Sequence, residues 1–317
     1  MKSALFSKAL FALMVALAWV LTAMPRRVSL AIGALLGRLL AVLGWKRTLI
    51  QSNLLLAFPG AFPGASPDAE RFRSDIERGF YRHFGRLFLE ILIQYSPAWR
   101  EWVQEQVVVH GRENWERAHA QGKGVLFVSN HVGNWEAMAA GMALAGADVL
   151  IVTKHLKPEW IHLSMERNRL KAGVRGTYEP KTLRDVLAHL KRGGTVGFVI
   201  DQYAGAPIGI RVPFFGVPVG TLSAPAIVAR RTGAVVLPVY NWRDPDGRFQ
   251  MWIGEPFPAF QGNSPRELAS QLALWVESTE KSVRKCPEQW LWSHRRFKGD
   301  LSPMAADEWD RPRERES

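Results

Sequence analysis

The sequence predicts an α/β fold: a mainly parallel central sheet flanked by helices, joined to N-terminal helices that associate with a membrane. Three observations predict this fold. Short apolar runs alternate with helix-like segments from residue 107 onward. The run TVGFVID (195–201) is almost wholly apolar, which is typical of a parallel strand covered on both faces. Two long apolar runs occupy the first 47 residues, and a hydrophobic fraction of 47% can supply a sizeable core.

The N-terminal runs are ALFALMVALAWVLTAM (9–24) and VSLAIGALLGRLLAVLGW (28–45), the second interrupted only by Arg38. The first is shorter than the roughly 20 residues of a perpendicular membrane span. A cleaved signal peptide with a cleavage signal at Ala16-Leu17-Ala18, a single tilted span and a membrane-seated helical pair are the alternatives. Because the apolar pattern continues past the candidate cleavage point, we favour an anchor over residues 1–47. Basic residues flank both runs: Lys2, Lys8, Arg26, Arg27, Lys46 and Arg47.

The rest of the chain divides into one large domain and a tail. Residues 48–66 hold a Pro/Gly cluster and are expected to form a connection. The domain is expected to cover 48–298, and residues 299–317 to form a charged, flexible tail. Strands are expected at 107–111, 125–130, 148–154, 195–201, 234–240 and 248–256. Helices are expected at 67–96, 115–124, 134–146, 162–173, 182–194, 222–233 and 267–285.

A histidine and a glutamate lie where the strand ending in VSN passes into a helix. His131 follows the strand, and functional groups gather at the carboxyl ends of parallel strands. If the helix begins near Gly133 or Asn134, Glu136 falls in its first turn and can fold back toward the imidazole. A carboxylate there would make His131 a general base, and free N–H groups of the helix could receive an oxyanion. The alternative is that a histidine or asparagine here caps the helix and that the helix dipole favours the glutamate that follows.

Composition and missing motifs narrow the remaining chemistry. The net charge of +12 indicates anionic partners, but the chain has no nucleic-acid recognition motif, so nucleic acid is not expected to be one of them. The lone Cys286 cannot form a disulfide or a cysteine zinc site within the chain. The sequence also lacks G-x-S-x-G, H-E-x-x-H, a P-loop and G-x-G-x-x-G. We therefore expect no metal and no bound cofactor. The mechanism that remains possible is direct attack on the substrate by an acceptor hydroxyl that the histidine deprotonates.

Six blocks of sequence, in order, resemble one family. They are QSNLLLAFP (51–59), SNHVGNWE (129–136), HLKPEWIHLSMERNRLKAG (155–173), LKRGGTVGFVIDQ (190–202), VPFFGVPVGT (212–221) and CPEQWLWSHRRFK (286–298). The second resembles the His-x4-acid motif of glycerolipid acyltransferases. Together the blocks resemble the bacterial lipid A late acyltransferases (lauroyl and myristoyl transferases) over roughly residues 25–298. The resemblance implies an enzyme of the inner membrane whose catalytic domain faces the cytoplasm.

The resemblance also implies substrates and residue roles. The donor would be an acyl thioester of acyl carrier protein, and the acceptor a hydroxyl of a lipid A precursor or another anionic glycolipid. His131 would be the base and Glu136 its partner; Arg169 would meet phosphate or the donor, and Asp201 would orient His131 or bind the acceptor. The candidate substrate-binding residues are Asn134, Arg169, Asp201, Gln202, Phe214, Phe215, Gly216 and Thr221.

Each of these roles has a simpler alternative. Arg169 could be an exposed helical arginine, Asp201 a turn residue and Thr221 a helix cap. The two phenylalanines could contact an acyl chain or pack in the core. Residues 151–192 carry ten basic and four acidic side chains, which suits an anionic lipid or carrier protein or else a solvated surface. At the level of the whole protein, the rivals are an acyl-CoA-dependent enzyme for another glycolipid or a phospholipid, and a non-catalytic protein that binds anionic lipid.

Overall fold

The computed structural model describes residues 2–59, 67–262 and 264–310. Its centre is a seven-stranded sheet with the order β1-β9-β8-β2-β5-β3-β4. Neighbouring strands are parallel except for β8 and β9, so the predicted α/β fold with a mainly parallel sheet is confirmed. The strands are β1 (Val107–His110), β2 (Val125–Ser129), β3 (Val149–Val152), β4 (Val174–Thr177), β5 (Thr195–Val199), β8 (Val235–Arg243) and β9 (Phe249–Ile253). All but β4 were expected from the sequence.

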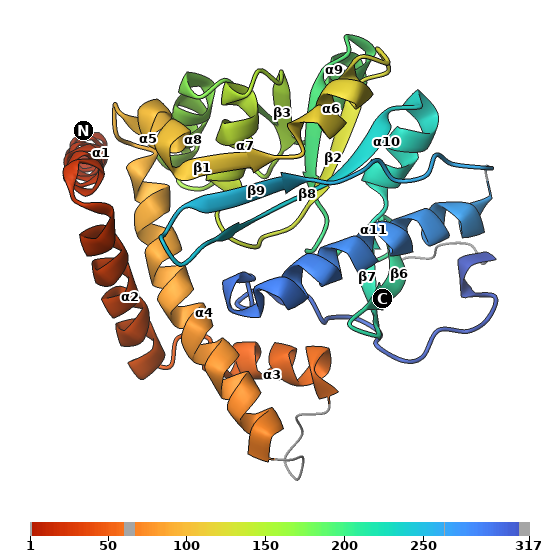
Figure 1. The fold of residues 1–317 in the computed structure, drawn as a ribbon, viewed down its shortest axis with the longest axis horizontal. Coiled ribbons are helices and arrows are strands. Elements are labelled where there is room, and N and C mark those ends of the chain that lie inside the picture. Colours follow the sequence, from red (N-terminus) through yellow and green to blue (C-terminus); the bar gives the residue numbers. More distant parts are fainter. Residues whose placement is uncertain (1, 60–66, 263, 311–317) are drawn as a thin grey trace.

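Helices cover both faces of this sheet (Figure 1). Alternate residues of β2 divide between two hydrophobic cores: Leu126 and Val128 belong to one, Val125 and Phe127 to the other. This is the arrangement that a continuous apolar strand requires, because both faces of β2 are buried. The helices are α5 (Trp99–Gln106), α6 (Arg112–His119), α7 (Trp135–Leu144), α8 (Glu159–Lys171), α9 (Thr182–Lys191), α10 (Ala224–Thr232) and α11 (Pro265–Lys285).

A second sheet was not expected from the sequence. It is an antiparallel hairpin of β6 (Gly209–Phe214) and β7 (Val217–Leu222). Phe215 and Gly216 form its turn with φ of 54° and 75°, so both turn residues are in the left-handed region that tight hairpins use. The backbone N–H of Phe215 donates to Glu280 on α11 at 2.6 Å. The turn of the hairpin is therefore tied to α11.

The N-terminal part consists of α1 (Lys2–Ala23), α2 (Arg26–Val42), α3 (Arg47–Ala57) and α4 (Pro67–Ile93). The expected connection over 48–66 is thus helical as far as residue 57, while its residues 60–66 lie outside the described chain. In Figure 1, α2 (red) runs alongside the long α4 (orange). Their backbones meet at glycines: a Cβ on Gly85 would lie 2.1 Å from the Gly33 carbonyl oxygen, and one on Gly37 would lie 1.9 Å from that of Tyr81.

The faces of α2 are inverted relative to a helix of a water-soluble protein. Its buried positions hold the small residues Ser29, Gly33, Ala34 and Gly37. Most of its large apolar side chains are exposed, namely Val28, Ile32, Leu35, Leu39 and Val42, whereas Leu30, Leu36 and Leu40 are half-buried. Leu13, Leu17, Trp19 and Val20 of α1 are exposed as well. Within the described residues, no single helix has the length and apolarity of a membrane span, whereas α2 and α3, bent by 95°, reach them as a pair.

Part of the predicted tail is packed on the domain. The Trp309 indole N–H donates to the Arg211 carbonyl oxygen at 2.9 Å, and the Arg211 guanidinium lies 3.1 Å from the Glu308 carboxylate. These contacts attach the tail to β6 as far as residue 310. Residues 311–317 of the expected flexible tail lie outside the described chain.

Candidate active site

Parallel pairing of β2 and β5 brings His131 and Asp201 together. Ser129 pairs with Val199, and the Ile200 N–H donates to the Ser129 carbonyl oxygen at 3.0 Å. The two strands therefore end level with each other, and the second residue beyond each pairing position is His131 on one strand and Asp201 on the other. This places both at the carboxyl edge of the sheet, where functional groups were expected.

Asp201 holds both the side chain and the backbone of His131. One carboxylate oxygen lies 2.7 Å from Nδ1 of the imidazole. The other accepts the backbone N–H of His131 at 2.7 Å and the indole N–H of Trp290 at 2.7 Å. Burial alone would raise the pKa of Asp201, but the charge of His131 and these hydrogen bonds lower the pKa to about 2. The carboxylate is therefore ionised at any physiological pH.

This contact fixes the tautomer of the imidazole. An ionised carboxylate only accepts hydrogen bonds, so the Nδ1 atom of His131 carries the proton and Nε2 carries the free lone pair. Nε2 faces the side-chain amide nitrogen of Gln202 at 3.4 Å. The His131 side chain is 14% exposed, and the Trp135 ring meets it edge-on at 4.7 Å. In this tautomer Nε2 is the ring nitrogen that can accept a proton.

Glu136 is engaged elsewhere. Its two carboxylate oxygens accept from Nε and Nη2 of Arg169 at 3.0 and 2.7 Å. Nη1 of Arg169 reaches Glu166 at 3.0 Å. Burial lowers the pKa of Arg169, but Glu136 and Glu166 overcome that effect and raise it. The expectation that Glu136 folds back to the imidazole is corrected, since Asp201 holds that position; the alternative of an exposed Arg169 is also wrong, since Arg169 is buried.

The loop between His131 and α7 is held from behind. Asn134 is fully buried and caps α7, because its side-chain oxygen accepts the N–H groups of Glu136 and Ala137 at 3.1 and 3.0 Å. The side-chain oxygen of Asn241 on β8 accepts the Asn134 N–H at 2.9 Å. Gly133 has φ of 68°, and a Cβ there would lie 2.3 Å from that same oxygen, so only glycine fits.

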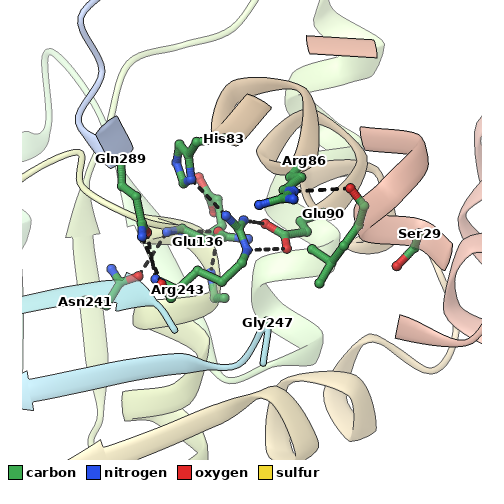
Figure 2. Close-up of polar contacts among 12 residues, drawn as sticks. Ser29, His83, Arg86, Glu90, Glu136, Asn241, Arg243, Gly247 and Gln289 are labelled. Carbon is green, nitrogen blue, oxygen red and sulfur yellow. Dashed lines mark hydrogen bonds and ion pairs between the residues drawn. The ribbon is translucent and has the colours of Figure 1, made fainter. Parts of the chain in front are cut away.

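Below this loop lies a buried ionic network (Figure 2). Arg243 on β8 forms an ion pair with Glu90 on α4 and donates to Nδ1 of His83 at 2.8 Å. Burial and the charge of Arg243 hold the pKa of His83 well below its ordinary value, so this histidine is neutral. The side chain of Gln289 forms two hydrogen bonds with the backbone of Arg243, at 2.7 and 2.8 Å. The backbone carbonyl oxygen of Gln289 accepts the Gly133 N–H at 3.2 Å. The network thus connects α4 to the loop between β2 and α7, which carries His131.

The other candidate residues lie around the β6–β7 hairpin. Phe214 and Phe215 were expected either to contact an acyl chain or to pack in the core. Both are buried in the hydrophobic core in this structure. Thr221 does not cap the following helix; its hydroxyl oxygen accepts from the buried guanidinium of Arg296 at 2.6 Å. Burial lowers the pKa of Arg296 to about 10. A cavity of about 500 Å³ is lined by Gly216 and by Leu56, Pro213, Val217, Pro218, Leu301, Pro303 and Met304, and none of the groups around His131 contributes to it.

The family model for the bacterial lipid A biosynthesis acyltransferases matches residues 2–299. The chain belongs to this family. A lipid A biosynthesis lauroyltransferase of Escherichia coli K12 is 26% identical over 290 residues, covering 88% of each chain. A lipid A biosynthesis palmitoleoyltransferase of the same strain is 28% identical over 295 residues, again covering 88% of each chain. A phosphatidylinositol mannoside acyltransferase of Mycobacterium tuberculosis is 26% identical over 204 residues, covering 62% of this chain and 61% of its own.

Family membership makes the protein an acyltransferase, and the resemblance read from six sequence blocks is confirmed. Several residues around the site of this acyltransferase were not predicted from the sequence. Asn241 lies in a strand that was expected to end at residue 240, so nothing marked it as a support of the catalytic loop. Trp290 and Arg296 belong to an aromatic and basic cluster in the last block, but their partners, Asp201 and Thr221, are distant in sequence. Only the three-dimensional fold reveals these contacts.

Proposed function

We propose that this acyltransferase moves a fatty acyl group from an acyl carrier protein thioester to a hydroxyl of a lipid A precursor or a related glycolipid, with His131 as the general base. Acyl transfer to a lipid is what the family does, and both Escherichia coli relatives are lipid A enzymes. The observation that carries the proposed mechanism is the bond from Nδ1 of His131 to Asp201, which leaves Nε2 free to take a proton.

The proposed reaction needs no covalent enzyme intermediate. The acceptor hydroxyl gives its proton to Nε2 of His131 and attacks the thioester carbonyl carbon. The carboxylate of Asp201 stabilises the imidazolium that forms, since it lies 2.7 Å from Nδ1. When the carbon–sulfur bond breaks, the imidazolium returns the proton to the thiolate. In this scheme the ion pair of Glu136 with Arg169 positions the first turn of α7 behind His131.

We also propose that α1 and α2 lie on the cytoplasmic face of the inner membrane. The support is the row of large apolar side chains that α2 exposes and the basic residues Arg27, Arg38 and Arg47 near it, which suit an anionic surface. Leu35→Gln/Leu39→Gln should weaken binding to phosphatidylglycerol vesicles at least about tenfold, since each leucine contributes roughly 1.5 kcal/mol of burial. Leu163→Gln on α8 is the matched control. Equal sedimentation of all three proteins with vesicles would contradict this placement.

The test of function is an acyl transfer assay in detergent with wild type and His131→Ala. The donors are acyl carrier protein thioesters and acyl-CoA; the acceptors are a lipid A precursor, a mannosylated inositol lipid and a lysophospholipid. We expect transfer from the carrier protein to the lipid A precursor and its loss in His131→Ala, with unchanged thermal unfolding. Full activity of the folded variant would exclude His131 as the base.

A second candidate acceptor is a mannosylated inositol lipid, because a phosphatidylinositol mannoside acyltransferase is among the relatives. Transfer only to that lipid would keep the mechanism and change the acceptor. A wild-type protein that binds anionic vesicles but transfers no acyl group from either donor would favour the rival hypothesis, a lipid-binding protein without catalysis.

A further inference from the structure

The oxyanion that forms in the proposed reaction needs a donor, and the obvious groups are occupied. Backbone N–H groups of the catalytic loop already have acceptors: His131 donates to Asp201, Val132 to Asn130, Gly133 to Gln289 and Asn134 to Asn241. The first turn of α7 is also capped, since the N–H groups of Glu136 and Ala137 donate to Asn134. The expectation that this helix N-terminus offers free N–H groups is therefore wrong for these positions.

Gln202 presents a side-chain donor at the reacting nitrogen. Its amide nitrogen lies 3.4 Å from Nε2 of His131. Because the proton of the imidazole is on Nδ1, Nε2 can only accept, so the amide group of Gln202 is the donor in this contact. A separation of 3.4 Å is longer than an ordinary N–H hydrogen bond, which makes the contact weak and easy to exchange. An acceptor hydroxyl that binds Nε2 must displace it.

The backbone of Gln202 is held firmly while its side chain is free to change partners. The guanidinium of Arg296 donates to the Gln202 carbonyl oxygen at 2.8 Å and to that of Gly220 at 2.9 Å, and it also reaches Thr221. Arg296 is fully buried and joins the end of β5 to the end of β7. The Gln202 amide can therefore move between neighbouring acceptors without moving its main chain.

From these contacts we infer that Gln202 is a catalytic residue whose amide N–H donates to the thioester carbonyl oxygen as negative charge forms there. This role rests on the proposed function. The hydroxyl oxygen bonds to the carbonyl carbon, the hydroxyl proton passes to Nε2, and the carbonyl π pair moves to the oxygen that faces Gln202. Collapse restores the carbonyl and expels the thiolate, which takes the proton from Nε2. In the resting enzyme the same amide covers Nε2.

Two variants and two readouts test this role. Gln202→Leu removes the donor at similar size, Gln202→Glu replaces it with an acceptor, and Gln104→Leu on the exposed side of α5 is the matched control. We expect kcat to fall about 10²–10³-fold in both Gln202 variants, as for loss of one oxyanion donor, with KM values nearly unchanged. We also expect diethyl pyrocarbonate to modify His131 faster in Gln202→Leu, as measured by peptide mapping, because the lone pair of Nε2 no longer accepts a hydrogen bond.

The outcomes separate this inference from the proposed function. A wild type that transfers no acyl group from either donor would overturn the proposed function and this role with it. An active wild type whose Gln202→Leu variant keeps kcat within about threefold would overturn this role alone and leave the backbone N–H of Trp135 as the rival donor. Modification of His131 at an unchanged rate would show that the amide does not cover Nε2, and would overturn the inference independently of turnover.

Discussion

Asp201→Asn should prevent His131 from acting as the proposed general base without disturbing the fold. One carboxylate oxygen of Asp201 accepts two hydrogen bonds, from the His131 backbone and from Trp290. An asparagine must place its only oxygen there, so its NH₂ group would face Nδ1 of the imidazole. The imidazole would then carry its proton on Nε2, where it cannot take one from the acceptor.

The size of the effect follows from the pKa of Asp201. Burial opposes the fall of the pKa from 3.8 to about 2, and the charge of His131 and the hydrogen bonds from His131 and Trp290 produce it; the net shift corresponds to roughly 2.5 kcal/mol in favour of the ionised carboxylate. If the imidazolium is fully formed in the transition state, losing that energy lowers the rate about 60-fold. The reversed tautomer adds to this, so kcat should fall about 10²–10⁴-fold.

The assay measures kcat per folded molecule for Asp201→Asn and for Glu136→Gln, together with urea unfolding. Glu136→Gln weakens a buried ion pair with Arg169, so it should lower the free energy of unfolding by up to roughly 3 kcal/mol while kcat stays within about tenfold. Glu136→Gln/Arg169→Met should regain part of that stability. The reasoning is refuted if Glu136→Gln abolishes turnover in folded protein while Asp201→Asn keeps more than about a tenth of kcat.

Three further predictions concern stability and reactivity. Because folding lowers the pKa of Asp201 to about 2, its contribution to stability is complete above about pH 5 and is lost as the pH falls to about 1; urea unfolding should show wild type losing roughly 2.5 kcal/mol more than Asp201→Asn over that range. Gly85→Ala should lower the free energy of unfolding by about 1–3 kcal/mol in the same assay, since its Cβ would lie 2.1 Å from the Gly33 carbonyl oxygen. The control is Gly122→Ala on the surface, where the new Cβ has open space and only the positive φ of the backbone is unfavourable. Burial raises the pKa of the Cys286 thiol to about 12, so alkylation by iodoacetamide at pH 8 should be about 10³-fold slower than for free cysteine; alkylation at the rate of free cysteine would contradict this burial.

The parts of the fold that the sequence predicted are those with a strong local pattern. The strand at 125–129 and the helix after it were recognisable because an apolar run ends at polar residues and a helical run follows. Strand β4, with the sequence VRGT, is short and carries an arginine and a glycine, so no alternation or apolar run marks it. Helix α3 was missed because the Pro/Gly cluster that follows it dominated the interpretation of 48–66.

The site was predictable only in part, for a physical reason. His131 and the edge on which it lies follow from the local pattern, and Glu136 was paired with it because the two are close in sequence. The residue that contacts the imidazole is Asp201, 70 residues away, which the resemblance gave as a residue that orients His131 or binds the acceptor; no local pattern marks it, and the pairing of β2 with β5 brings it there. The capping role of Asn134 was recognised as an alternative. The ion pair of Glu136 with Arg169 was not, because Arg169 lies on another helix and no periodicity in the sequence indicates a contact between two helices.

Because β2 and β5 end at paired residues, the turnover rate of the enzyme depends on the register between these two strands. A slip of one residue between them would move Asp201 by about 3.3 Å along the strand and turn its side chain to the opposite face. Such a molecule could keep its helices and most of its core, so its circular dichroism would look native. His131 would nevertheless lose the carboxylate that sets its tautomer. A misaligned fraction would thus appear as folded but inactive protein. A titration of active sites would measure this fraction as the shortfall from one active site per folded molecule.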